Sequence, residues 1–67
     1  LPIYHMPGGE IINLKYLTKI GNPMIAGSRY FVSVYIQGLD NLTYYFNTKQ
    51  EAETFRDNLV EATSVIS

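Results

Sequence analysis

The chain has 67 residues, no cysteine and a formal net charge of −1, and 46% of its residues are hydrophobic. This composition is typical of a folded domain and argues against a disordered segment, a disulfide framework and a thiolate metal site. No apolar run approaches the roughly 20 residues that cross a bilayer, so we expect a soluble, cytoplasmic protein that has no membrane partner.

The hydrophobic core of such a chain must be small. A domain of this size buries roughly 60% of the surface that its unfolded chain exposes. Domains below about 70 residues commonly need disulfides, a metal or association to be stable. Because cysteine is absent, association with a second copy or with a larger partner is the remaining device. We expect one small domain, residues 1–67.

The first part of the chain predicts a hairpin whose second strand is kinked. Residues 2–6 are expected to form a strand, residues 7–9 (Pro-Gly-Gly) a turn, and residues 10–20 the returning strand. Strict alternation cannot place all the apolar residues of 10–20 on one face. We therefore expect a bulge or a single helical turn near Lys15.

Residues 21–28 contain Gly, Asn, Pro and Ser, which predict a loop. The middle of this loop nevertheless contains Met24 and Ile25. These two side chains either fold back over one end of the core or form a hydrophobic finger for a partner protein, because exposed methionine adapts to irregular apolar surfaces. Both are candidate partner-binding residues.

Two alternating runs, residues 29–37 and 42–47, predict a second hairpin. The even-numbered positions are the more apolar and form the core face, whereas Phe31, Tyr35 and Tyr45 lie on the opposite face. Residues opposite one another in an antiparallel pair share a face, so even-numbered residues must pair with even-numbered ones. The connecting loop therefore has an odd length of three or five residues.

The hydrophobic period changes at Thr48. The sequence Thr48-Lys49-Gln50-Glu51 matches a capping box and predicts a helix over residues 48–63. An apolar stripe at helical spacing is expected to face the sheet. It consists of Ala52, Phe55, Leu59 and Ala62, with Val60 beside them.

An acidic ridge follows the same helix, because Glu53, Asp57 and Glu61 recur every four residues. Like charges at this spacing oppose helix formation by a few tenths of a kcal/mol per pair. The ridge is either a solvated face or a surface for a basic partner.

These elements predict an α+β fold: a small antiparallel sheet of about four strands (β-hairpin, kinked strand, β-hairpin) with one C-terminal amphipathic helix packed on one face. The order is similar to that of small bacterial and phage domains in which a segment like residues 12–17 (Ile-Asn-Leu-Lys-Tyr-Leu) precedes a hairpin and a short acidic helix. The resemblance implies a bacterial or phage protein and assigns no site residue.

A single helix covers only one face of a sheet, so Phe31, Tyr35 and Tyr45 need another cover. The N-terminal hairpin, a second copy of the chain and another ligand are the three alternatives. The leading hypothesis is a noncatalytic protein-binding domain of unknown process that self-associates, as a homodimer or a larger assembly, through these aromatics or through an exposed strand edge.

Sheet aromatics also stack nucleic-acid bases in several binding modules, and this is the alternative function. Lys15, Lys19 and Arg29 would then form a local basic patch. The overall charge disfavours this alternative, because six acidic residues outnumber five basic ones.

Nothing in the sequence assembles a catalytic constellation. His5 is the single histidine, and one histidine without cysteine makes a poor metal site. No nucleophile, base and oxyanion donor can be assigned together. We therefore expect no enzyme activity, no cofactor and no metal.

Overall fold

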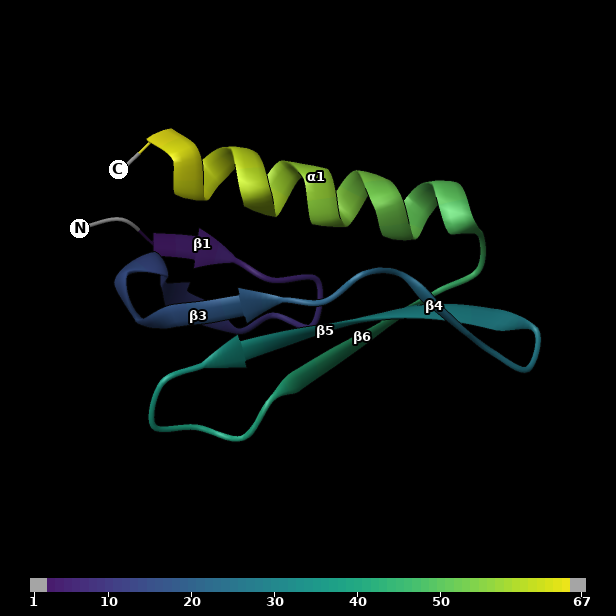
Figure 1. Cartoon of the computed structure of the whole chain (residues 1–67), viewed down its shortest axis with the longest axis horizontal. Helices are drawn as coiled ribbons and strands as arrows, with labels where there is room; N and C mark the ends of the chain where they lie inside the picture. Colours follow the sequence, from purple (N-terminus) through teal and green to yellow (C-terminus); the bar gives the residue numbers. More distant parts are fainter. Residues whose placement is uncertain (1–2, 66–67) are drawn as a thin grey trace.

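The computed structural model describes residues 3–65 (Figure 1), and its first element pair is the expected hairpin. Strand β1 (Ile3–His5) pairs antiparallel with β2 (Ile11–Asn13). The Met6 amide donates to the Glu10 carbonyl at 2.7 Å and closes the turn. The predicted start of the first strand at residue 2 lies outside the described residues.

The expected kink is a short 3-10 helix, η1 (Leu14–Tyr16). Its N-terminal cap is Asn13, whose Oδ1 accepts a hydrogen bond from the Lys15 amide at 2.9 Å. After this turn, β3 (Leu17–Ile20) joins a different sheet from β2. The kink near Lys15 is confirmed, and it transfers the chain from the hairpin to the main sheet.

The predicted loop over residues 21–28 is wrong in its middle, because Met24–Ala26 form strand β4. This strand continues the line of β3 along the same side of β5 (Arg29–Ile36), with Met24 opposite Phe31. The Gly-Asn-Pro breakers interrupt the edge for only three residues. Backbone pairing to β5 therefore determines the structure of this segment.

Strands β5 and β6 (Leu42–Phe46) pair in an unbroken register in which Val32 lies opposite Tyr44. Even-numbered residues pair with even-numbered ones, as expected, and five residues connect the two strands. Gly38 has φ +84° in this loop, a conformation that favours glycine. The four-stranded sheet is antiparallel throughout, with β5 between β6 and the β3–β4 edge.

Helix α1 (Lys49–Val65) begins where the capping box predicts and extends two residues beyond the expected end. The Glu51 amide donates to Thr48 Oγ1 at 3.1 Å, and the Thr48 amide donates to Glu51 Oε1 at 3.2 Å. These reciprocal hydrogen bonds satisfy two amides that would otherwise lack partners at the start of the helix.

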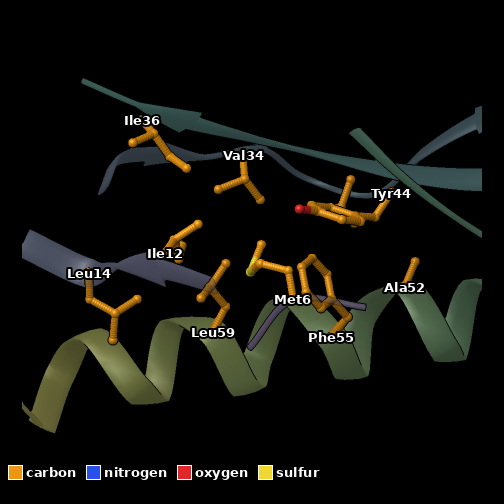
Figure 2. Close-up of a cluster of buried hydrophobic side chains, with 10 residues drawn as sticks. Met6, Ile12, Leu14, Val34, Ile36, Tyr44, Ala52, Phe55 and Leu59 are labelled. Atoms are coloured by element: carbon orange, nitrogen blue, oxygen red, sulfur yellow. The ribbon is translucent and has the colours of Figure 1, made fainter. Parts of the chain in front are cut away.

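The core lies between α1 and one face of the four-stranded sheet, and the hairpin contributes to it from the same side. Figure 2 shows hairpin side chains between the helix and the sheet. The buried residues are Met6, Ile12, Leu14, Val32, Val34, Ile36, Tyr44, Ala52, Phe55 and Leu59. The hairpin therefore does not cover the second face of the sheet, which removes one of the three expected covers. The chain is an α+β fold with one C-terminal helix, as predicted.

Candidate functional site

The candidate site is the face of the four-stranded sheet opposite α1, called the outer face below. Strand alternation and the observed cross-strand pairs assign its residues. They are Lys19, Met24, Arg29, Phe31, Ser33, Tyr35, Thr43 and Tyr45. On the opposite face of the sheet, Val32 and Val34 of β5 are fully buried against the helix and the hairpin (Figure 2). The predicted sidedness of both strands is confirmed.

The three predicted aromatics of this face form two groups rather than one. The ring centroids of Phe31 and Tyr45 lie 5.7 Å apart at an interplanar angle of 43°. Tyr35 lies four residues beyond Phe31 on the same strand, a separation of about 13 Å along β5. Tyr45 is 53% exposed and Tyr35 is 38% exposed, so both rings are open to a ligand.

Each exposed tyrosine of the outer face has a basic side chain over its ring. Lys19 Nζ lies 5.2 Å from the centroid of the Tyr35 ring. The Arg29 guanidinium carbon lies 5.3 Å from the centroid of the Tyr45 ring. Such cation–π contacts contribute roughly 0.5–1 kcal/mol at exposed sites and hold the charged group over the sheet.

Lys15, the third predicted basic residue, belongs to η1. Its Nζ lies 6.0 Å from the centroid of the neighbouring Tyr16 ring. The sequence pattern identifies the cations and the aromatics but does not show which cation lies over which ring. Only the register of β3 on β5 reveals the pairing of Lys19 with Tyr35.

A shallow hollow of about 250 Å³ lies on the outer face beside the interruption between β3 and β4. Ser33 lies between Phe31 and Tyr35 along β5 and lines this hollow, with Lys19 among the other lining residues. Ser33 Oγ lies 3.5 Å from Thr43 Oγ1 on the next strand. The middle of the outer face is therefore polar, between two cation–tyrosine pairs.

Gly21 forms the near wall of this hollow. Its amide donates to the Ser33 carbonyl at 2.8 Å, and a Cβ atom at this position would lie only 3.1 Å from that oxygen. On the other side of the sheet, Arg56 of α1 donates from Nε to the Gly21 carbonyl at 3.0 Å. The helix thereby fixes the point at which the edge strand is interrupted.

The acids of the molecule lie away from the outer face, whereas its cations are divided, with Lys49 and Arg56 on α1. The outer-face residues include two cations, Lys19 and Arg29, and no acid. Four of the six acids lie on α1, which packs against the opposite face of the sheet. The outer face therefore carries local positive charge although the net charge of the chain is −1.

The other predicted site residues lie elsewhere. Met24 is 59% exposed and lines the hollow. Ile25 is 67% exposed and lies on the opposite face of β4. Neither caps the core. The acidic ridge of Glu53, Asp57 and Glu61 is exposed along α1, away from the outer face.

Within residues 3–65, no group of three or more His, Cys, Asp and Glu side chains could hold a metal ion. Apart from the Tyr44 hydroxyl, no polar or charged side chain of this range is buried in the core. Burial, together with a hydrogen bond to Glu10 and the charge of that carboxylate, raises the pKa of Tyr44 to about 12.

No helix in the described range is long and apolar enough to span a membrane.

Comparison with protein-family models, with curated proteins and with solved structures finds no match for this chain.

Proposed function

We propose that this chain is a noncatalytic binding module that binds nucleic acid with the outer face of its sheet. The observation that carries the proposal is the placement of the acids: Lys19 and Arg29 lie on an open aromatic face that has no acid, while four of the six acids lie on the helix behind it. Phosphate contacts require local positive charge, which this face provides despite the net charge of −1.

The geometry favours phosphate contacts at the ends of the face and polar contacts in the middle. Each cation lies over a tyrosine ring, which limits its conformations and leaves its charge directed to the same side of the sheet. Ser33 and Thr43 lie between the pairs and offer hydroxyl groups to sugar, phosphate or base edges. Tyr45 supplies the most exposed ring for stacking.

Lys19 and Arg29 on the outer face, with Lys15 of the preceding η1, provide two to three phosphate contacts, so we expect weak binding. Non-specific complexes have dissociation constants of about 10⁻⁴ to 10⁻⁶ M, and each phosphate contact adds roughly 0.9 to the slope of log K against log salt for duplex DNA. We therefore expect a slope of about −2 to −3 for this module.

The test is titration of fluorescently labelled single-stranded and duplex oligonucleotides at several salt concentrations, read by anisotropy. Lys19→Gln and Arg29→Gln should each weaken binding severalfold and reduce the magnitude of the salt slope by about 1. Lys49→Gln is the matched control, because it removes the same charge from the exposed first turn of α1. Binding by this control should remain close to that of the wild type.

Two results would overturn the proposal. One is the absence of salt-dependent binding to both oligonucleotide forms. The other is an equal loss for Lys19→Gln and Lys49→Gln, because such a loss would reflect total charge rather than the outer face.

Self-association through the aromatics of the outer face is the second candidate, favoured by the exposed rings of Tyr35 and Tyr45. A face-to-face pair would also bring Lys19 and Arg29 of two copies close together, which like-charge repulsion opposes. Light scattering of Tyr35→Ser combined with Tyr45→Ser tests this candidate. A dimer that becomes monomeric would support it, and an unchanged mass would remove it.

A further inference from the structure

Strand β6 forms an unprotected edge of the main sheet (Figure 1). Within residues 3–65 it pairs with β5 alone, so one row of its backbone amides and carbonyls lacks a strand partner. Its five residues, Leu-Thr-Tyr-Tyr-Phe, include no charge and no proline, and its register on β5 is unbroken. Charges, proline and bulges are the usual devices that prevent strand addition, and β6 has none of them.

The opposite edge differs from β6 in each of these respects. Strand β3 carries Lys19 and has a register shift between Leu17 and Lys19. The chain between β3 and β4 contains Pro23 and interrupts the edge. This side of the sheet is therefore protected against strand addition, and β6 is the edge available for pairing.

The sequence of β6 is complementary to itself in antiparallel pairing. With Tyr44 on a two-fold axis, Leu42 lies opposite Phe46 of a second copy, and Thr43 lies opposite Tyr45 of that copy. The first pair is apolar and lies on the helix side, where both side chains are half-buried in a single chain. The second joins a β-branched and an aromatic residue, a favourable cross-strand combination, on the outer face. No like charges meet at any position.

We propose that two copies of this chain associate along β6, antiparallel and with the two-fold axis at Tyr44. The axis is perpendicular to the sheet, so both helices lie on one side and both outer faces form one continuous surface. The half-buried Leu42 and Phe46 lose their remaining contact with water, which supplies the stabilisation that so small a core lacks. This assembly does not depend on nucleic-acid binding, although it would double the cations of the surface.

Charge substitution at the edge tests the pairing by sedimentation or light scattering. The wild type should have twice the 7.6 kDa mass of one chain. Thr43→Asp with Tyr45→Asp should be monomeric, because the carboxylates face one another across the axis, and Thr43→Lys with Tyr45→Lys should be monomeric for the same reason. An equimolar mixture of the two should regain the dimer mass. Gln50→Asp with Asn58→Asp, which adds two acids to exposed positions of α1, should remain dimeric.

Cysteine pairing tests the register, since the chain has no native cysteine. A mixture of Thr43→Cys and Tyr45→Cys chains should form a disulfide-linked dimer faster than either variant alone, because only the mixture places two thiols directly opposite. A wild type that is monomeric at every attainable concentration overturns the proposal. So does a dimer that survives the paired aspartates while circular dichroism shows the native fold.

Discussion

The Tyr44 hydroxyl donates a hydrogen bond to Oε1 of Glu10 at 3.1 Å, across 34 positions of sequence. It joins β6 to the turn of the N-terminal hairpin. The Tyr44 ring itself packs against Phe55 of α1, with 5.5 Å between centroids. One side chain thus connects the hairpin, the sheet and the helix.

This contact predicts a specific loss of stability at high pH. The pKa of Tyr44 is raised from 10.0 to about 12 in the folded state, first by burial and then by Glu10. The unfolded state loses this proton near pH 10, so it binds fewer protons than the folded state between pH 10 and 12. The free energy of unfolding should fall across that range by up to about 2–3 kcal/mol, with the full stabilisation present below pH 10.

Urea denaturation from pH 8 to 12 measures this loss, with Tyr44→Phe as the reference that cannot ionise. The stability difference between wild type and Tyr44→Phe should narrow as the pH rises. The difference between the absorbance titrations of wild type and Tyr44→Phe at 295 nm should show an ionisation with a pKa of about 12. Equal pH dependence of the two proteins would contradict the prediction.

Leu59→Ala should destabilise the fold by about 2–5 kcal/mol, because it leaves a cavity between the helix and the sheet. Leu59 is fully buried, and a domain of this size has little stability to lose. Val60→Ala is the matched control one residue away, where the side chain is 36% exposed. Thermal unfolding of the two variants should differ by many degrees, and similar midpoints would disprove the assigned facing of α1.

Thr48→Ala should cost about 1 kcal/mol of folding free energy, because the Glu51 amide loses its acceptor. Thr48→Ser keeps the oxygen and should stay near wild type. Chemical denaturation followed at 222 nm compares the two. The hydroxyl has no capping role if serine and alanine behave alike.

Gly38→Ala should destabilise the β5–β6 loop by about 1–2 kcal/mol, because φ of +84° places a Cβ atom too close to the following carbonyl. Leu39→Ala, at the next and exposed position, is the control and should have a small effect. Equilibrium unfolding provides the measurement. A neutral Gly38→Ala would mean that the loop readily adopts another turn.

Much of the candidate site could be predicted from the alternation of residues along each strand. Alternation in residues 30–36 determines that Phe31 and Tyr35 share a face, because successive side chains of a strand point to opposite sides. Tyr45 lies on the same face because odd-numbered residues of one strand pair with odd-numbered residues of the other across the hairpin. The pairing of cations with tyrosines could not be read, because Lys19 reaches Tyr35 only through a register set by the bulge in β3.

The local features follow from the amino-acid pattern: the hairpin turn, the kink near Lys15, the capping box at Thr48 and the buried faces of β5 and β6. Each depends on residues close together in the chain, so short-range hydrogen bonding and periodicity suffice. Tertiary structure alone decided that Met24–Ala26 form a strand and that the hairpin packs on the helix side. Those outcomes depend on backbone pairing and shared burial between distant segments, and they leave the outer face open.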